Sequence, residues 1–414
     1  MNRFAILSHI LPPAFSGQSV ALYRLLRDAA PKDYCLISVV DYDQYTGVTA
    51  TSRLPAPYFH LAPEGTPRVR GIPLRSIREN VNTAISIPFA VRTRAKSIVQ
   101  VLEGQGCHGI VACSGDLIDL PAACAAARSM KVPFFPYLFD WYAFQFRASP
   151  KTRGRILASY ARFYEPRIMK YAAGAFVPNE FMRDECKKRH GLDPVIVRCA
   201  TDFAFSQNEP VDTQCPANGD SINIRFTGAV YIVNYDAFRT LRRALDAISS
   251  FSIRLEVISG KSSDTLKCAG LREWEQLPQV SAQEAQRLQR EADILFLPLG
   301  FDTPYPEIVR TSAPTKTGDY LASGRPIIVY APSDSFLAWY FREHECGVVV
   351  DRPEAEALKE AIVKIVKTPS LRQKLSRNAL ERARADFHYE PARDAFFGEL
   401  DKKLGAPGGG SVGW

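Results

Sequence analysis

Short apolar runs alternate with helical patterns along almost the entire chain, and this alternation restricts the possible folds more than any other feature. In the first half, an apolar run at residues 3–10 precedes a helical pattern at 17–30 and a second apolar run at 34–41. Short, continuously apolar runs are typical of strands buried on both faces of a parallel sheet. Strands that alternate with helices predict a doubly wound α/β sheet. Further strands of the first half are expected at 109–115, 133–140, 174–179 and 194–202.

A polar segment, SQNEPVDTQCPANGDS, interrupts this pattern, and its content of Pro, Gly and Asn is typical of a linker. The alternation then begins again, which predicts a second Rossmann-like domain. Such sheets bind ligands at the carboxyl ends of their strands, so we expect two domains that face a cleft. The expected segments are an N-terminal domain (1–205), the linker (206–221), a C-terminal domain (222–387), a helix that packs back on the N-terminal domain (388–404) and a disordered Gly-rich tail (405–414).

Several motifs are missing from the sequence. No G-x-G-x-x-G follows a strand-like run, and there is no phosphate-binding G-x-x-x-x-G-K-[ST] and no Ser-centred elbow. The nine cysteines contain no C-x-x-C pair, which favours free buried thiols in a reducing compartment. No apolar run is long enough to span a membrane, and the first apolar stretch is too short for a signal peptide. We therefore expect a cytoplasmic protein.

One stretch places a lysine where a helix should not favour it. Residues 313–330 read APTKTGDYLASGRPIIVY, with Thr315 as the expected N-cap, Lys316 as the first helical residue and Gly324 as the stop. A lysine meets the positive end of the helix dipole there, so the conflict suggests a bound anion such as a diphosphate. Asp319, one turn later, would suit the paired hydroxyls of a ribose. The alternative is an exposed ion pair between Lys316 and Asp319.

The same stretch resembles the motif P-S-K-x-x-E-Y-L-A-x-G-x-P-[IV]-[IV] of the retaining family 4 glycosyltransferases, which have the GT-B fold. Other segments resemble elements of that family as well, among them RFTGAV, CGVVVD and, near the N-terminus, LPPAFSGQSVALYRLL. The resemblance covers nearly the whole chain and is more specific in the C-terminal half. It implies transfer of a sugar from a nucleotide-diphosphate sugar to a glycan or lipid-linked acceptor, with retention, in polysaccharide or glycolipid biosynthesis. It also implies that no metal or other cofactor is bound.

The resemblance further implies roles for individual residues. Lys316 would neutralise the diphosphate, and Asp319 would bind the donor ribose. Gly17 and Gly228 would let the backbone approach the phosphates, because glycine has no side chain in the way. Asp140 would lie near the donor sugar as a catalytic carboxylate, and the alternative is a capping or structural carboxylate.

The sequence departs from the family pattern at two places. The first acidic residue of the E-x7-E motif would fall on Thr311, so Glu307 is the nearest candidate for a catalytic carboxylate. The usual Arg/Lys pair after the strand that precedes Gly228 is missing, which leaves Arg310 to assist Lys316 at the diphosphate. Two alternatives therefore stay open: a GT-B sugar-nucleotide epimerase and a non-catalytic protein that binds nucleotide sugars.

Positive charge is concentrated in the first half of the chain. Residues 1–200 hold 26 Lys and Arg against 15 Asp and Glu, whereas the remainder holds 26 against 29. No nucleic-acid-binding motif accompanies this charge, so we expect no nucleic-acid partner. Residues 68–102 and 151–172 mix bases with apolar residues, which favours peripheral binding to an anionic membrane; the alternative is a helix with a solvated charged face. The bases of the first segment are Arg68, Arg70, Arg75, Arg78, Arg92, Arg94 and Lys96.

Overall fold

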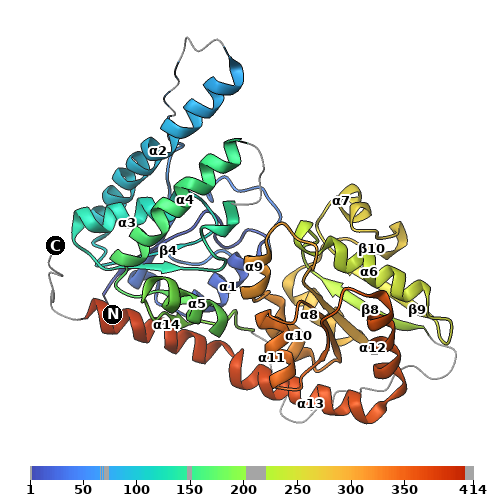
Figure 1. Cartoon of the computed structure of the whole chain (residues 1–414). Helices are drawn as coiled ribbons and strands as arrows, with labels where there is room; N and C mark the ends of the chain where they lie inside the picture. Colours follow the sequence, from blue (N-terminus) through green and yellow to red (C-terminus); the bar gives the residue numbers. More distant parts are fainter. Residues whose placement is uncertain are drawn as a thin grey trace. The chain divides into compact units, whose positions relative to one another are not determined.

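The chain forms two α/β units, each built on a parallel sheet with helices on both faces (Figure 1). Unit 1 runs to Arg198 and includes the chain from Ala392 onward, and unit 2 comprises Cys199–Pro391. The doubly wound α/β class predicted from the alternation is thereby confirmed. This computed structural model describes residues 2–65, 67, 69, 74–146, 152–201 and 221–405.

Three predicted features fall partly outside the described residues. They are the linker at 206–220, the tail at 406–414, and Arg68 and Arg70 of the basic segment. The domain boundaries named above stay predictions.

The sheet of unit 1 has the strand order β3-β2-β1-β4-β5-β6-β7. Strand β1 pairs in parallel with both β2 and β4, with Ala5 opposite Cys35 and Ile110. The chain order reverses between β1 and β4, and such a switch point is where doubly wound sheets bind ligands. The strands are β1 Phe4–Leu7, β2 Tyr34–Ser38, β3 Tyr58–His60, β4 Ile110–Cys113, β5 Phe134–Tyr137, β6 Phe176–Val177 and β7 Val195–Ile196.

Helices cover both faces of this sheet because successive side chains of a strand point to opposite sides. Ala5 and Leu7 belong to the core cluster that includes α2, α3 and α4, whereas the ring of Phe4 packs against Phe396 of α14 at 6.2 Å between centroids. The helices are α1 Gly17–Leu26, α2 Arg75–Gln105, α3 Asp119–Met130, α4 Thr152–Tyr171, α5 Glu180–His190 and α14 Tyr389–Leu404, with single 3-10 turns at Pro31–Asp33 and Phe144–Phe146.

The sheet of unit 2 has the strand order β10-β9-β8-β11-β12-β13. All its pairings are parallel, and the switch point lies between β8 and β11. Strands such as β11, ILFLP, are buried along their whole length, which explains their uninterrupted apolar sequence. The strands are β8 Ile222–Thr227, β9 Ile253–Ile258, β10 Gln276–Leu277, β11 Ile294–Pro298, β12 Ile327–Tyr330 and β13 Val348–Val350.

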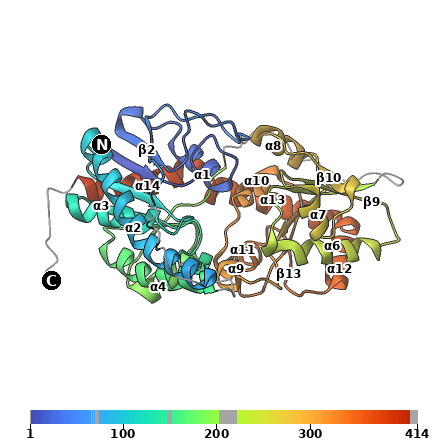
Figure 2. The same cartoon turned by 90° about the horizontal axis from the view of Figure 1, so that it is seen from above.

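Figure 2 shows α6 and α12 on one face of this second sheet and α10 and α13 on the other. Ile224 and Phe226 of β8 pack in one cluster with Phe238 of α6 and Ile362 of α12. The helices are α6 Tyr235–Asp246, α7 Ser263–Cys268, α8 Ala282–Arg290, α9 Pro306–Thr311, α10 Lys316–Ser323, α11 Phe336–Glu343, α12 Ala355–Lys367 and α13 Pro369–Asp386, with 3-10 turns at Ile232–Asn234 and Glu273–Glu275.

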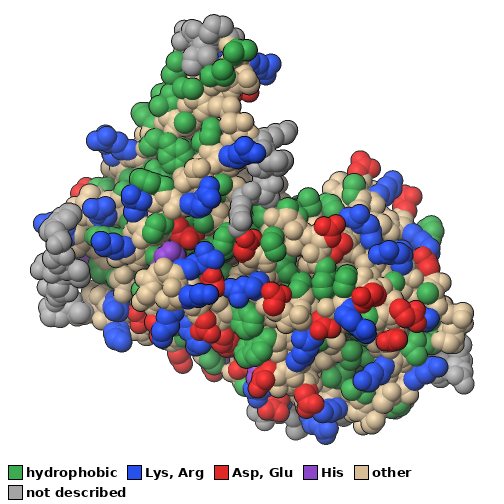
Figure 3. Space-filling model, viewed as in Figure 1, with side chains coloured by type: hydrophobic (Ala, Val, Ile, Leu, Met, Phe, Trp, Pro, Cys, Tyr) green, Lys and Arg blue, Asp and Glu red, His purple; other side chains and the backbone are tan. Residues whose placement is uncertain are grey.

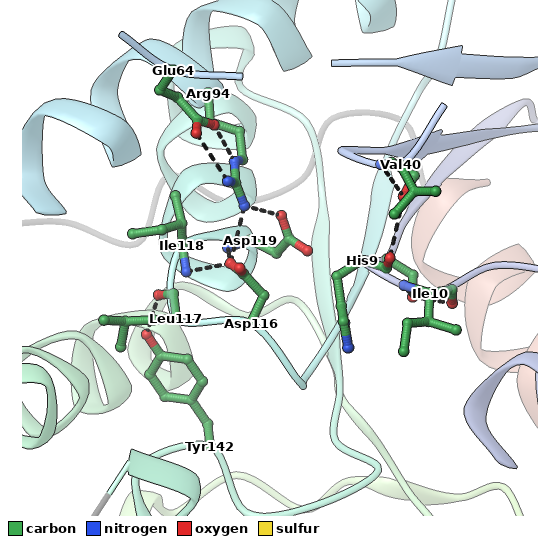
Figure 4. A network of polar contacts seen from close by, with 12 residues as sticks. His9, Ile10, Val40, Glu64, Arg94, Asp116, Leu117, Ile118, Asp119 and Tyr142 are labelled. Atoms are coloured by element: carbon green, nitrogen blue, oxygen red, sulfur yellow. Dashed lines mark hydrogen bonds and ion pairs between the residues drawn. The ribbon is translucent and has the colours of Figure 1, made fainter. Parts of the chain in front are cut away.

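A buried ion cluster joins α2 to the start of α3 in unit 1 (Figure 4). The guanidinium of Arg94, only 6% exposed, lies 2.6 Å from Asp119, 3.0 Å from Asp116 and 2.5 Å from Glu64. Three carboxylates thus share one cation. Burial, assisted by the charge of Asp116, raises the pKa of Asp119 to about 7 despite the nearby guanidinium. The packing of α2 on α3 therefore depends on the charge of Arg94.

Replacement of this cation should destabilise the protein strongly. We expect Arg94→Met to lower the free energy of unfolding by about 3–5 kcal/mol, because buried carboxylates lose their counter-ion. Denaturant unfolding above about pH 8, where Asp119 is ionised, measures the loss. Asp119→Asn in the same background should restore part of it. Lys96→Met, exposed on the same helix, is the control and should change stability by less than about 0.5 kcal/mol.

Candidate functional site

The end of β8 meets the start of α10 at two residues predicted from the sequence, Gly228 and Lys316. Gly228 directly follows β8 with a φ of +124°, which L side chains rarely adopt. A Cβ at this position would lie 2.7 Å from the Lys316 amine nitrogen. Both the backbone angle and the close approach therefore require glycine here.

The Lys316 amine packs on an aromatic ring and has no counter-ion among the residues that the structure describes. Its Nζ lies 3.7 Å from the centroid of the Phe226 ring. Within the described part of the chain, no ion pair joins this half-buried lysine to a carboxylate. Burial lowers the pKa of Lys316 to about 7. The site therefore holds a positive charge that an incoming anion would stabilise.

The first turn of α10 adds hydrogen-bonding groups at the same place. Thr315 occupies the N-cap position, as predicted, but its side chain makes no capping hydrogen bond. Thr317 is buried, and its hydroxyl has no hydrogen-bond partner among the described residues. Gly324 ends the helix in the left-handed conformation, as the sequence predicts. A helix N-terminus without a side-chain cap, next to a lysine, favours an anion.

Asp319 lies one turn further along α10, and its side chain accepts hydrogen bonds from other segments of unit 2. Its Oδ1 accepts a hydrogen bond from the Thr201 hydroxyl at 2.7 Å and one from the Gln286 amide at 3.4 Å. The alternative of an exposed Lys316–Asp319 ion pair is wrong, because the Lys316 amine lies over Phe226 instead. The ribose-binding role of Asp319 stays a prediction.

The two candidates on α9, Glu307 and Arg310, lie in its first and last turns. Thr311, at the position where the family pattern has an acid, is 3% exposed and donates its hydroxyl hydrogen bond to the Glu307 carbonyl at 3.2 Å. This hydroxyl therefore makes a hydrogen bond within α9. The roles of Glu307 in catalysis and of Arg310 at the diphosphate stay predictions.

The remaining candidates, Gly17 and Asp140, lie in unit 1. Gly17 begins α1 and is preceded by Ser16, whose side chain caps the helix by accepting from the Ser19 amide. Asp140 follows β5, and its amide donates to the Ser114 hydroxyl at 3.3 Å. Its carboxylate accepts no hydrogen bond and meets no cation among the described residues, and burial raises its pKa to about 6. The capping alternative for Asp140 is therefore not what the structure shows.

His9 was not among the residues predicted from the sequence, yet it lies at the switch point of unit 1 (Figure 4). It follows β1, and a Cβ on Gly115 would lie 2.0 Å from its Cε1, so the ring packs directly on that glycine. Its Nδ1 is buried with no partner among the described residues. Burial lowers the pKa of His9, although the charge of Asp116 opposes this, so the imidazole is neutral near pH 7. A lone histidine directly after the first strand was the available signal.

Comparison with solved structures identifies the fold of the chain. A glycosyltransferase from Rickettsia africae ESF-5 matches with a TM-score of 0.63 at 12% identity, over 98% of this chain and 100% of that one. Sucrose-phosphate synthase from Thermosynechococcus elongatus reaches 0.66 at 14% identity, over 98% and 99%. Anabaena HepE, in complex with UDP-glucose, reaches 0.61 at 11% identity, over 97% and 100%. These similarities show that the chain has the GT-B fold, which confirms the fold that the sequence resemblance implied.

The same fold also occurs in a protein of different description. A putative UDP-N-acetylglucosamine 2-epimerase from Listeria monocytogenes matches with a TM-score of 0.52 at 10% identity, over 97% of this chain and 96% of that one. No known sequence family and no curated protein sequence matches the chain. Similarity at these identities establishes the fold but not the reaction.

The uncompensated charge of Lys316 should appear in the stability of the ligand-free protein. A lysine whose folded pKa is about 7 binds fewer protons when folded than when unfolded between about pH 7 and 10, so its destabilising effect is complete below pH 7 and fades as pH rises. We expect Lys316→Met to raise the free energy of unfolding by at least about 1 kcal/mol near pH 6 and by much less near pH 9.5. Denaturant unfolding at both pH values measures this, and an equal effect at both would contradict it.

Proposed function

We propose that the chain is a cytoplasmic glycosyltransferase that transfers a sugar from a nucleotide-diphosphate sugar to a glycan or lipid-linked acceptor. Transfer proceeds with retention of anomeric configuration, as part of polysaccharide or glycolipid biosynthesis. In this proposal unit 2 binds the donor and unit 1 binds the acceptor. The GT-B fold supports the proposal, because solved structures with this fold include a glycosyltransferase and a protein in complex with UDP-glucose.

The observation that carries the proposal is the state of Lys316. Its amine lies between the Phe226 ring and the Gly228 backbone, at the switch point of the second sheet, with no carboxylate paired to it in the described structure. A purely structural lysine in this position would cost stability for no gain. A diphosphate supplies the missing negative charge.

The other donor contacts are proposed from the family resemblance. In unit 2, the backbone at Gly228, the first-turn amides of α10 and Arg310 assist Lys316 at the diphosphate, and Asp319 contacts the ribose. In unit 1, Gly17 is assigned a backbone approach to phosphate. In this proposal the cations of the protein replace a metal ion, so no cofactor is required. Among the described residues, no three His, Cys, Asp or Glu side chains are grouped as metal ligands.

In the reaction, the bond between the sugar's anomeric carbon and the phosphate oxygen breaks, and the diphosphate leaves with the electron pair. An acceptor hydroxyl oxygen forms the new bond to that carbon from the same face, and its proton passes to the departing diphosphate. Lys316 and the helix N-terminus stabilise the charge that develops on the leaving oxygen. Asp140 has an unpaired carboxylate, and we assign to it the stabilisation of positive charge that develops on the sugar. Glu307 is the second candidate carboxylate.

Nucleotide binding tests the proposal directly. We expect UDP, GDP or ADP to raise the melting temperature of the full chain, because a ligand that binds the folded state stabilises it. Lys316→Ala should lower the affinity for that nucleotide by at least about tenfold, since a charge-assisted contact of about 1.4 kcal/mol or more is lost. Lys267→Ala, an exposed lysine of unit 2, is the matched control and should bind as the wild type. Equal binding by both variants would remove Lys316 from the site.

Turnover separates the proposed reaction from its two alternatives. The protein is incubated with an acceptor and with sugar conjugates of the nucleotide that raised the melting temperature, and the products are examined by NMR. We expect release of nucleoside diphosphate and a glycosylated product whose anomeric configuration is the same as in the donor. An altered configuration within the sugar of an intact nucleotide sugar would instead indicate an epimerase. Binding without any turnover, across a panel of acceptors, would favour a non-catalytic nucleotide-sugar-binding protein.

The proposed role of Asp140 predicts a pH dependence. Activity should rise as the carboxylate ionises, through about pH 6, because only the anion stabilises positive charge. Asp140→Asn should lower kcat by about 100-fold or more while nucleotide binding is retained. Asp184→Asn, an exposed carboxylate in unit 1, serves as the control. An Asp140→Asn variant with a normal kcat and pH profile would exclude this role.

A further inference from the structure

Helix α2 changes its surroundings halfway along its length. Its buried residues begin at Ile87 and continue to Leu102, where they pack in the core of unit 1. None of the residues from Arg75 to Ser86 is buried. In Figure 1 this N-terminal half of α2 projects beyond α3 and α4 of the same unit. The first half of this helix therefore contributes no buried residue to the core of unit 1, although the Ala84 carbonyl accepts a hydrogen bond from the Tyr160 hydroxyl of α4 at 2.8 Å.

The projecting half is nevertheless apolar along one side. Five large apolar residues follow one another at intervals of three, four, four and four. The first precedes the helix in an extended conformation, and the spacing places the other four on one helix face. Leu74 is 63% exposed, Ile77 47% and Phe89 44%. Figure 3 shows hydrophobic side chains along this part of the molecule. We call this face the α2 stripe; its members are Leu74, Ile77, Val81, Ile85 and Phe89.

The charge around the stripe has one sign. Between residues 74 and 96 the only acidic residue is Glu79, which is engaged by Arg75 at 2.8 Å. Arg92 and Lys96 are exposed and continue the face of the stripe beyond Phe89, at intervals of three and four. Arg94, on the inner side, is neutralised in the buried cluster described above. The outer face of α2 thus combines exposed apolar side chains with unneutralised bases.

We propose that the α2 stripe binds the surface of an anionic lipid bilayer. Its apolar side chains enter the boundary between headgroups and acyl chains, while Arg78, Arg92 and Lys96 contact lipid phosphates. None of the helices in the described part of the chain is long and apolar enough to cross a membrane, so the contact is at the surface. The proposal does not rest on nucleotide-sugar transfer, although it would place the enzyme beside a lipid-linked acceptor.

Charge complementarity favours lipid over a second copy of the chain. A symmetric dimer through this face would bring the same surface of both subunits together, and with it the bases of one copy against those of the other. Like charges in such an interface are unfavourable. An anionic bilayer instead offers acyl chains to the apolar residues and negatively charged headgroups to the bases.

Flotation of the full-length chain with vesicles tests the proposal. We expect binding to vesicles that contain phosphatidylglycerol, weaker binding to pure phosphatidylcholine, and a decrease with salt. The combined variant Ile77→Ser/Val81→Ser/Phe89→Ser should bind at least about tenfold more weakly. Arg78→Gln/Arg92→Gln/Lys96→Gln should lose the preference for anionic lipid and most of the salt dependence.

Controls keep the result interpretable. Trp274, 74% exposed in unit 2, offers a matched surface change, and Trp274→Ser should float as the wild type. Unchanged melting temperature and nucleotide affinity in each variant show that the fold and the donor site are intact. The proposal is overturned by absence of flotation at low salt, by undiminished flotation of the stripe variant, or by binding that ignores lipid charge. A dimer in sedimentation that the stripe variant abolishes would replace the bilayer with a second copy.

Discussion

Burial of both faces of a parallel sheet governs the placement of every candidate functional group in this protein. Strands such as FAIL in unit 1 and ILFLP in unit 2 are buried along their whole length and consist of apolar residues. The charged residues inside β8 and β9, Arg225 and Glu256, pair with each other, so the polar groups left for a ligand lie mainly where strands end. At the carboxyl ends these include His9 and Asp140 in one unit and the Gly228–Lys316 contact in the other. The sheets thus determine where chemistry is possible.

The buried charged groups are of two kinds, those paired with an opposite charge and those without one among the described residues. The cluster around Arg94 is a structural one, in which carboxylates and a guanidinium satisfy one another by direct ion pairs. Lys316 and Asp140 are each desolvated without an opposite charge among the described residues, and their pKa values move toward neutrality as a result. A group that is desolvated but unpaired is costly unless a ligand completes it. This contrast is why the proposed function begins from Lys316.

Helix α2 has side chains at the surface that lack partners within the described chain. Its second half gains stability by covering the first sheet, whereas its first half exposes an apolar stripe next to bases. Exposed apolar surface of this kind is typical of interaction sites, which is the basis of the proposed contact with a lipid surface. The sequence indicated a basic amphipathic segment here, and the structure shows which side of the helix remains uncovered.

Local sequence signals were enough to predict three features. Apolar runs predicted the doubly wound class, and the signals for a helix start and a C-terminal glycine predicted the bounds of α10 at Lys316 and Gly324. Each of these signals involves only a few neighbouring residues. Even so, β3 and β10 were not predicted, because their sequences, YFH and QL, do not form an apolar run. Contacts between distant residues could not be predicted either. Asp319 engages Thr201, and His9 packs on Gly115, because the fold brings together segments about a hundred residues apart. The sequence by itself determined the two sheets and the helix start. Only the tertiary structure decided that Lys316 meets no counter-ion among the described residues, because burial and pairing depend on neighbours from other strands.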